Sequence, residues 1–333
     1  MKTPRIAING FGRIGRTLTG LLLRDKRFDL VAINDLADVK TMAHLFKYDS
    51  IHGVRDVQVE TKADELIIEG KPIQFLNCKN LEDLPWSKLD IDVVVECTGV
   101  FKSKVMLERH LAAGAKRVLL SVPPEDDSIK TLVLGVNDHL LDAGDTIISN
   151  ASCTTNNAAP MIQLLDELCN IESCYITTVH SYTGDQRLHD APHKDLRRSR
   201  AAGLSIIPTT TGAAKALTKV FPHLTGSMGG CGMRVPVPNG SLTDITCTVK
   251  NPKSAQVIND YFRQASEGRL AGILQYTEDP IVSVDVIDNP HSCVFDAQLT
   301  SVIGNMVKVV GWYDNEFGYS NRLRDLLARM TNA

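Results

Sequence analysis

The sequence predicts an α/β protein in which a doubly wound, mostly parallel sheet is followed by an α+β part with an open mixed sheet. Short β-branched runs, separated by helical stripes, fill the first 150 residues and are typical of strands buried on both faces. Longer strand-like stretches follow after residue 150. The length of 333 residues corresponds to about two domains. We expect residues 1–150 and 316–333 to form one domain and residues 151–315 the other.

The N-terminal part alternates apolar runs with amphipathic ones. Strands are expected over residues 5–9, 30–35, 91–98, 116–121 and 131–136. A stripe formed by Ile14, Leu18, Leu21 and Leu22 predicts a helix after the first strand, and residues 106–115 predict another. This β-α-β order implies a parallel sheet.

The C-terminal part has a different pattern of apolar residues, with longer strand-like stretches. Strands are expected over residues 174–182, 232–237, 241–250, 281–287 and 306–313. Helices are expected over residues 153–168 and 316–330, and the second of these should pack back on the first domain. Residues 188–200 are polar, basic and interrupted by a proline, so we interpret them as a long loop.

The composition is that of an ordinary globular chain, with 43% apolar and 23% charged residues. A formal net charge of −3 gives no global field for nucleic acid or an anionic membrane, and no apolar window is long enough to span a bilayer. The eight cysteines are scattered without a CxxC pair, and the N-terminus does not resemble a signal peptide. We therefore expect reduced thiols and a cytoplasmic location.

A glycine-rich motif, GFGRIG at residues 10–15, follows the first strand and opens the first helix. In Rossmann-type folds, Gly10 would form the tight turn, Gly12 would admit a pyrophosphate, and Gly15 would allow close helix–sheet packing. Asp35 ends the second strand, where a carboxylate accepts from ribose hydroxyls and repels a 2′-phosphate. The pattern predicts NAD binding, with a plain glycine-rich turn as the alternative.

A hydroxyl-rich segment, SNASCTTN at residues 149–156, precedes the predicted helix over 153–168. Asn150 and Ser152 are suitable helix caps, which places Cys153 in the first turn. Free backbone N–H groups and the helix dipole favour a thiolate there. The segment therefore predicts a reactive cysteine, with a structural cysteine as the alternative.

His180 lies in the strand-like run YITTVHSY, on the face shared by Ile176 and Thr178. Taken alone it reads as a core histidine, but a reactive thiol needs a base and few other histidines have an apolar-strand context. His189 and His193 have the spacing of metal ligands, but Pro192 interrupts that segment. We expect no metal site.

Two further features suit anions. Residues 209–212 (TTTG) precede a helix-forming run, so hydroxyls and free N–H groups would meet at a helix start, and Arg198 lies in a basic stretch. Arg234 sits inside the apolar strand GMRVPV, where an unpaired guanidinium would cost several kcal/mol. Either an anionic substrate or a structural salt bridge would explain Arg234.

Over essentially its whole length, the sequence resembles the phosphorylating glyceraldehyde-3-phosphate dehydrogenases. The likeness is carried by INGFGRIGR, AIND, KYDS, SNASCTTN, HSYT, IIPTTTGAAKA, MRVPVP and GWYDNEFGYS. It implies the NAD-dependent oxidation of D-glyceraldehyde 3-phosphate, with inorganic phosphate, to 1,3-bisphosphoglycerate through a cysteine thioester, as in glycolysis and gluconeogenesis. It also implies a homotetramer.

The resemblance implies roles for matching residues. Cys153 would be the nucleophile and His180 the base. Thr183 and Arg234 would bind the substrate phosphate, whereas inorganic phosphate would lie against Ser152, Thr154, Thr211 and Gly212, with Arg198 nearby. The cofactor would contact Gly10, Gly12, Arg13, Ile14, Gly15, Asn34, Asp35, Lys79, Thr98, Ser121, Asn315 and Tyr319.

The sequence departs from this family in two informative places. Asn157 stands where the family usually has a second cysteine, so a disulfide to the nucleophile cannot form there. Ala191-Pro192 lies between the Leu-Pro of NAD-specific members and the Ala-Ser of photosynthetic, NADP-accepting members. Because Asp35 favours NAD and Ala191 tolerates NADP, we expect NAD as the cofactor and NADP as a poorer acceptor.

Four alternative functions stay open at this point. Two of them are closely related to the family named above. One is an erythrose-4-phosphate dehydrogenase, although such enzymes usually differ in the segments that here read HSYTGDQ and PTTTGAAKA. The other is an NADP-tolerant anabolic glyceraldehyde-3-phosphate dehydrogenase. An amino-acid semialdehyde dehydrogenase would lack the SNASCTTN context. A non-enzymatic binding protein finds no support in the sequence, which has an intact catalytic set.

Overall fold

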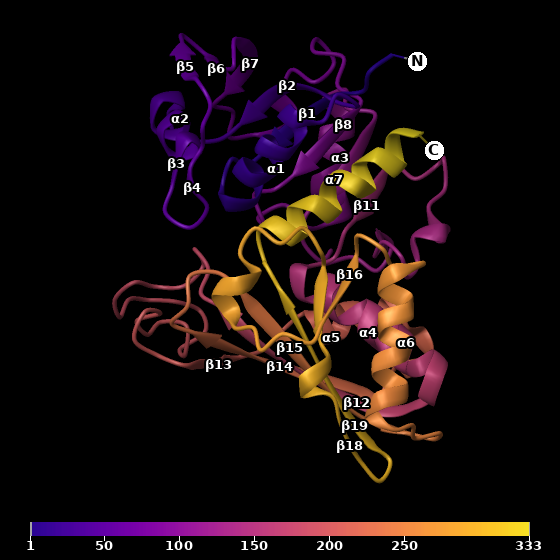
Figure 1. The fold of residues 1–333 in the computed structure, drawn as a ribbon. Coiled ribbons are helices and arrows are strands. Elements are labelled where there is room, and N and C mark those ends of the chain that lie inside the picture. Colours follow the sequence, from indigo (N-terminus) through magenta and orange to yellow (C-terminus); the bar gives the residue numbers. More distant parts are fainter. Residues whose placement is uncertain (1, 333) are drawn as a thin grey trace. The chain divides into compact units, whose positions relative to one another are not determined.

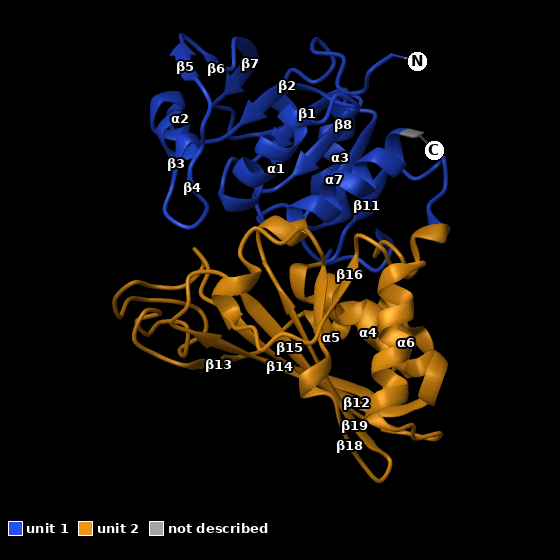
Figure 2. Ribbon diagram, in the orientation of Figure 1, with its two compact units in different colours: residues 1–132, 140–151, 320–333 blue, residues 133–139, 152–319 orange. Residues whose placement is uncertain are grey.

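A computed structural model describes residues 2–332, and two compact units make up the chain (Figure 2). Unit 1 contains the residues up to 132, residues 140–151 and the chain from residue 320; unit 2 contains residues 133–139 and 152–319. Residues 133–139 lie with unit 2 because the side chains of Leu270 and Ile273 pack directly against Gly135. The sequence placed residues 133–139 in the first domain instead, and its divisions at residues 150 and 316 compare with unit boundaries after residues 151 and 319.

Unit 1 is built on a nine-stranded sheet with the order β10-β11-β9-β8-β1-β2-β7-β6-β5 (Figure 1). The strands are β1 (Arg5–Asn9), β2 (Asp29–Asn34), β5 (Val59–Lys62), β6 (Glu65–Ile68), β7 (Lys71–Leu76), β8 (Val93–Glu96), β9 (Arg117–Leu120), β10 (Lys130–Thr131) and β11 (Ile147–Ser149). Only the pairs β5–β6 and β6–β7 are antiparallel. The strand order outward from β1 in both directions makes the sheet doubly wound, as predicted.

The helices of unit 1 are α1 (Arg13–Arg24), α2 (Val39–Lys47), α3 (Lys104–Ala112) and most of α7 (Phe317–Asn332), and β3 (Tyr48–Asp49) pairs with β4 (Gly53–Val54). Leu323, Leu326 and Leu327 of α7 are fully buried. The guanidinium of Arg117, at the start of β9, donates to the carbonyl of Met330. The C-terminal helix therefore packs back on the first unit, as the apolar stripe predicts.

Unit 2 contains an eight-stranded mixed sheet with the order β13-β14-β12-β15-β19-β17-β16, to which β18 adds by pairing with β19. The strands are β12 (Ile171–Ser181), β13 (Ile207–Thr209), β14 (Met228–Val235), β15 (Ser241–Val249), β16 (Leu274–Thr277), β17 (Cys293–Asp296), β18 (Ser301–Ile303) and β19 (Met306–Tyr313). Its helices α4 (Cys153–Cys169), α5 (Ala213–Val220) and α6 (Ala255–Glu267) contact the sheet. The predicted α/β class with a second mixed sheet is confirmed.

Two predicted strands differ from the structure because side chains draw the backbone into turns. The strand expected over residues 281–287 is wrong: Ser283–Val286 form a single 3-10 turn, closed by the Asp285 carboxylate accepting from the Val282 N–H at 2.7 Å. The strand expected over residues 131–136 ends at Thr131, since Asn137 accepts from the Val133 N–H and Asp138 from the Gly135 N–H. Across residues 2–332, no helix combines the length and apolar character needed to cross a membrane.

Candidate active site and cofactor pocket

The glycine motif of unit 1 forms a turn that only glycine fits at two of its positions. Gly10 has a φ of +96°, and a Cβ there would lie 2.7 Å from the Thr98 backbone nitrogen. A Cβ on Gly15 would lie 2.1 Å from the Gly10 carbonyl oxygen. A Cβ on Gly12 would meet no protein atom within 4 Å, so its face is open to a ligand. This is the division of roles expected of a pyrophosphate-binding turn at the start of α1.

Asp35 follows β2 and is held in place by backbone groups. One carboxylate oxygen accepts from the Phe11 N–H of the glycine turn at 2.7 Å, and the other accepts from the Ala37 N–H at 3.0 Å. The carboxylate therefore has a fixed position beside the glycine turn, where its remaining lone pairs are available to hydroxyl groups.

A cavity of about 600 Å³ lies within unit 1 at this point. Six of the residues expected to contact the cofactor line it, namely Gly10, Gly12, Asn34, Asp35, Lys79 and Thr98, together with apolar side chains such as Leu36 and Val100. Its volume and its apolar walls around a few polar groups suit the adenosine part of a dinucleotide. The residues present in unit 1 thus fit the cofactor that the sequence predicts.

Four other expected cofactor residues of unit 1 do not line that cavity: Gly15, which packs within the glycine turn, and Arg13, Ile14 and Ser121. The Arg13 guanidinium pairs with Asp49 at 2.8 Å. Although burial opposes ionisation of Asp49, the backbone N–H groups of Ile51 and His52, with Arg13, lower its pKa to about 2. Ile14 lies in the first turn of α1, and Ser121 follows β9, where its N–H donates to the Glu96 carbonyl.

Buried hydrogen bonds fix the base of this cavity. The Glu96 carboxylate accepts from the Asn9 amide at 2.6 Å and from the Thr98 N–H at 2.8 Å, and Asn9 in turn accepts from Asn34 at 2.7 Å. His110 lies 3.1 Å from the same carboxylate. Glu96 and this network connect the ends of β1, β2 and β8, and sequence reasoning missed them because Glu96 reads as part of an apolar strand.

In unit 2, the predicted nucleophile and base lie together. Cys153 is the first residue of α4, which Ser152 caps by accepting from the Thr155 N–H at 3.1 Å. The Cys153 Sγ lies 3.5 Å from Nε2 of His180, near the end of β12. Both side chains come from segments that the sequence placed correctly, so the pair arises from the docking of α4 against the sheet.

Arg234 lies beside His180 because the two residues are direct register partners on the parallel strands β12 and β14. The Arg234 guanidinium donates to the Ser181 carbonyl at 2.9 Å and lies 2.7 Å from Nδ1 of His180. No carboxylate of residues 2–332 forms an ion pair with Arg234. A structural salt bridge therefore does not account for it, which favours an anionic substrate.

The electrostatics keep the resting pair uncharged. Burial, together with the positive charge of Arg234, lowers the pKa of His180 to about 3. Burial raises the pKa of the Cys153 thiol, while Arg234 and the N–H and hydroxyl of Thr154 act to lower it. Burial of Cys153 therefore opposes the lowering of its pKa that the helix N-terminus favours.

Tyr313 completes this site and was missed by sequence reasoning. It ends β19, and its hydroxyl bonds to Thr154 Oγ1 at 2.9 Å and to Thr178 Oγ1 at 3.0 Å. Its ring meets that of His180 edge-on, with centroids 6.0 Å apart. The motif GWYDNEFGYS contains Tyr313, but no local signal shows that it joins α4 to β12.

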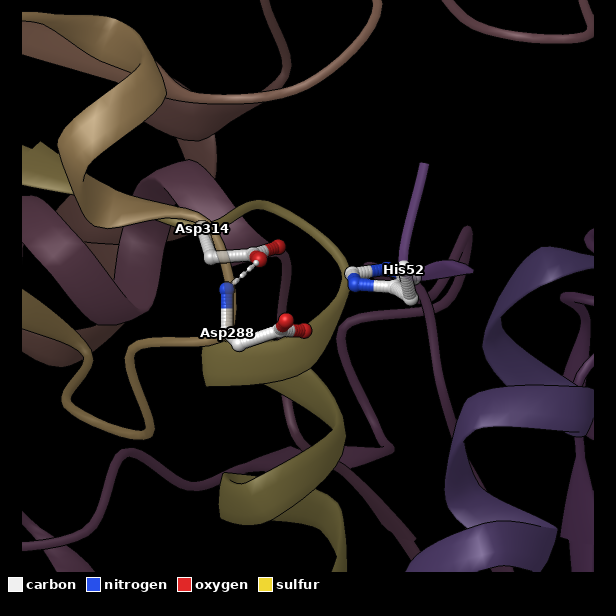
Figure 3. A group of neighbouring side chains, drawn as sticks. All are labelled: His52, Asp288 and Asp314. Carbon is white, nitrogen blue, oxygen red and sulfur yellow. Dashed lines mark hydrogen bonds between the residues drawn. The ribbon is translucent and has the colours of Figure 1, made fainter. Parts of the chain in front are cut away.

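Asn315 is fixed two residues further on. Its Oδ1 accepts from the hydroxyls of Ser181 and Ser241, each at 2.8 Å, which leaves its NH₂ group oriented to donate elsewhere. The turn is stabilised by buried Asp314, which accepts from the N–H groups of Asp288 (Figure 3), Glu316 and Phe317, all at 2.8 Å. Tyr319, the other expected cofactor residue of unit 2, is buried in the first turns of α7.

The remaining predicted anion-binding residues lie at three places in unit 2. Gly212 caps α5, and the Thr211 hydroxyl accepts from the Ala213 N–H at 3.2 Å. Arg198 donates to the Thr209 hydroxyl at 2.9 Å and also contacts Asp185. Thr183 is half-buried just beyond β12. Asp185 is the contact of Arg198 that sequence reasoning did not identify, whereas Thr209 belongs to the TTTG segment that it singled out.

The cofactor pocket of unit 1 points to a class of protein, the nicotinamide-dependent oxidoreductases. Residues 4–104 match the family model described as "Glyceraldehyde 3-phosphate dehydrogenase, NAD binding domain", and residues 152–315 match that of the C-terminal domain. The chain belongs to the glyceraldehyde 3-phosphate dehydrogenase family.

Similar curated proteins cover nearly the whole chain. It is 51% identical to glyceraldehyde-3-phosphate dehydrogenase 2 of Streptomyces avermitilis, with 99% of each chain covered. It is 50% identical to glyceraldehyde-3-phosphate dehydrogenase 2 of Bacillus subtilis, covering 97% of this chain and 95% of that one. The enzyme of Mycobacterium tuberculosis is also 50% identical, with 98% of each chain covered.

Proposed function

We propose that this protein oxidises D-glyceraldehyde 3-phosphate with NAD and inorganic phosphate, through a thioester on Cys153, and releases 1,3-bisphosphoglycerate. The observation that carries the proposal is the 3.5 Å approach of Cys153 Sγ to His180 Nε2 at the start of α4. Family membership supplies the substrate class, and the geometry supplies a nucleophile with its base. An erythrose-4-phosphate dehydrogenase is not favoured, since both matched family models are those of the glyceraldehyde-3-phosphate enzyme.

His180 acts as the base in this proposal. Nδ1 of His180 lies 2.7 Å from the Ser181 carbonyl and 2.7 Å from the Arg234 guanidinium. In the tautomer proposed here, Nδ1 carries the ring proton and directs it to that carbonyl, so that the Nε2 lone pair faces the Cys153 thiol. Because both groups rest uncharged, the proton moves from sulfur to Nε2 as the sulfur attacks the aldehyde carbon. Arg234 stabilises the negative charge that develops beside it.

The residues of the unit 1 cavity would hold NAD, which would supply the hydride acceptor needed to convert a hemithioacetal into a thioester. Asn315 supports the positioning of the nicotinamide carboxamide, since its Oδ1 is occupied by two serine hydroxyls and its NH₂ group is directed away from them. Asp35 disfavours NADP because a carboxylate held by two backbone N–H groups cannot turn away from a 2′-phosphate. Asp35→Gly should therefore raise kcat/KM for NADP relative to NAD by roughly 5- to 1000-fold.

Two anion sites are proposed around the nucleophile. Arg234 and Thr183 bind the phosphate of the substrate. Ser152, Thr154, Thr211 and Gly212 bind the attacking inorganic phosphate with Arg198, whose contact with Asp185 would be exchanged for the phosphate. Thr154 contributes through its backbone N–H in the first turn of α4, because its hydroxyl is already bonded to Tyr313.

The homotetramer is part of the same proposal, together with a cytoplasmic location. Four large apolar side chains of the loop region 188–206 are exposed: Leu188 by 83%, Leu196 by 81%, Leu204 by 86% and Ile206 by 69%. Several exposed apolar side chains along one loop region support a surface that another subunit covers. A sedimentation mass of one 36.5 kDa chain would refute the assembly.

One steady-state assay tests the chemistry. Formation of reduced cofactor is followed with glyceraldehyde 3-phosphate or erythrose 4-phosphate, with NAD or NADP, and with or without phosphate. We expect fastest turnover with glyceraldehyde 3-phosphate, NAD and phosphate, and a loss of more than about 10⁴-fold in Cys153→Ser with NAD affinity retained. Cys231→Ser is the matched control at another half-buried cysteine. Phosphate-independent turnover, or activity in Cys153→Ser, would contradict the proposal.

A further inference from the structure

A second pair of cysteines lies in unit 2, apart from the nucleophile. Cys174 on β12 and Cys247 on β15 are direct partners in the antiparallel register. Both are buried, and each side chain affects the pKa of the other. The mechanism uses neither side chain.

The backbone pattern shows how close these two residues are. The Cys174 N–H donates to the Ser227 carbonyl at 2.9 Å, on the opposite side of β12 from β15. In a strand, the N–H and C=O of one residue point to the same side, so Cys174 and Cys247 form a non-hydrogen-bonded pair. Their Cα atoms are then about 4.5 Å apart, the closer of the two antiparallel spacings and within the range that a disulfide spans.

Small molecules have a route to both thiols. A cavity of about 430 Å³ is lined by Cys174 and Cys247, along with Ser227, Gly229 and Met306. Cys169, at the end of α4, lies near enough to affect Cys247 but does not line this cavity. The accessible partner of Cys247 is therefore Cys174.

We propose that Cys174 and Cys247 are an oxidisable dithiol that closes to a reversible cross-strand disulfide in the presence of a peroxide. The Cys174 sulfur attacks a peroxide oxygen, the O–O bond breaks, and Cys174 becomes a sulfenic acid. The Cys247 sulfur then attacks the Cys174 sulfur, so that the S–S bond forms, the S–O bond breaks, and water leaves with the Cys247 proton. Two thiols and one hydrogen peroxide give one disulfide and two waters.

Cys174 is assigned as the first sulfur to react because it is the more exposed of the two residues, at 6% against 1% for Cys247. In the same direction, the contact with Cys247 lowers the pKa of Cys174, while the pKa of Cys247 is raised by that contact and by burial. The thiolate is the nucleophile towards peroxides. Cys247 is the thiol that resolves the sulfenic acid.

The test uses the full-length chain with Cys153→Ser, so that the nucleophile itself cannot be oxidised. After treatment with hydrogen peroxide, free thiols are alkylated and the protein is cleaved with trypsin and an endoproteinase that cuts after Glu. Cleavage after Glu167 and Glu172 separates the cysteines: residue 169 lies in peptide 168–172, Cys174 in 173–187 and Cys247 in 235–250.

We expect peptides 173–187 and 235–250 to be joined, with a mass lower by two hydrogens than the sum of the free peptides, and to separate again with dithiothreitol. The oxidised protein should also show a rise in Tm of several degrees, because the cross-link constrains the unfolded chain. Cys247→Ser should abolish both effects, whereas Cys293→Ser, at a fully buried cysteine, should keep both. Joining of 168–172 to 235–250, or full alkylation of Cys174 and Cys247 after peroxide, would overturn the proposal.

Discussion

The glycine turn of unit 1 and the cysteine site of unit 2 are built in opposite ways. The glycine turn lies within residues 10–15, and its geometry follows from contacts among neighbours, such as Gly15 against the Gly10 carbonyl. The cysteine site combines Cys153, His180, Arg234 and Tyr313 from α4, β12, β14 and β19. The glycine turn is thus mainly local, with the Thr98 backbone as its one distant constraint on Gly10, whereas sheet topology determines the cysteine site.

The two regions should also fail for different reasons when altered. In the glycine turn a substitution introduces a steric collision, so stability and cofactor affinity should respond. In the cysteine site a substitution causes no steric collision, but it changes the charges and proton acceptors around Cys153. The reaction rate and its pH dependence should therefore respond.

His180→Gln should give the largest effect, which at neutral pH is a loss of reaction rate. Without the Nε2 lone pair facing Cys153, the thiol at 3.5 Å has no proton acceptor. We expect both kcat and the rate of alkylation by iodoacetamide at neutral pH to fall by about 10²–10⁴-fold. Stopped-flow turnover and timed alkylation measure these rates, and NAD affinity serves as the control. Alkylation at the wild-type rate would show that His180 is not the base.

The same histidine should make the protein sensitive to acid. The folded-state pKa of about 3 lies below the ordinary value of 6.5, so the unfolded chain binds the proton first as the pH falls. The stability associated with His180 is therefore complete above pH 6.5 and is lost between about pH 6.5 and pH 3.

Urea unfolding at pH 7.5 and pH 4.5 measures this loss. We expect His180 to account for about 2–3 kcal/mol of the decrease between those pH values. His180→Gln should lose correspondingly less stability over this interval, while His189→Gln, at an exposed loop position, should behave like the wild type. Parallel curves for His180→Gln and the wild type would contradict the assignment.

The glycine turn offers a matched pair of variants. Gly15→Ala forces a Cβ to within 2.1 Å of the Gly10 carbonyl oxygen, so we expect it to destabilise the protein by about 1–3 kcal/mol. Gly12→Ala meets no protein atom, so its Tm should stay within about 2 °C of the wild type while NAD affinity falls by roughly tenfold or more. Thermal unfolding and calorimetric titration with NAD separate the two. Equal losses of Tm in both variants would contradict the assignment of Gly15 to helix–sheet packing and of Gly12 to contact with the ligand.

The same contrast explains what the sequence could and could not predict. The turn at residues 10–15 and the start of α4 at Cys153 are local, and both are as predicted. The role of Asp285 in closing a turn over residues 283–286 is also local, but it was hidden by the β-branched residues around it. Tyr313 could not be found, because its position between Thr154 and Thr178 depends on how β19 and β12 are arranged in one sheet.

Tyr313→Phe should give the smallest effect and shows whether the cysteine site depends on that long-range connection. The ring and its edge-on contact with His180 are retained, but the hydroxyls of Thr154 and Thr178 lose their shared partner. Because all three side chains are buried, we expect a loss of about 1–2 kcal/mol in unfolding free energy. Since Thr154 adjoins the nucleophile, kcat should fall by several-fold, with NAD affinity unchanged. Tyr276→Phe, which removes a hydroxyl bonded to the exposed Glu278, is the matched control and should change neither quantity by a comparable amount. An unaltered kcat together with the stability loss would show that Tyr313 holds α4 to the sheet without positioning Cys153.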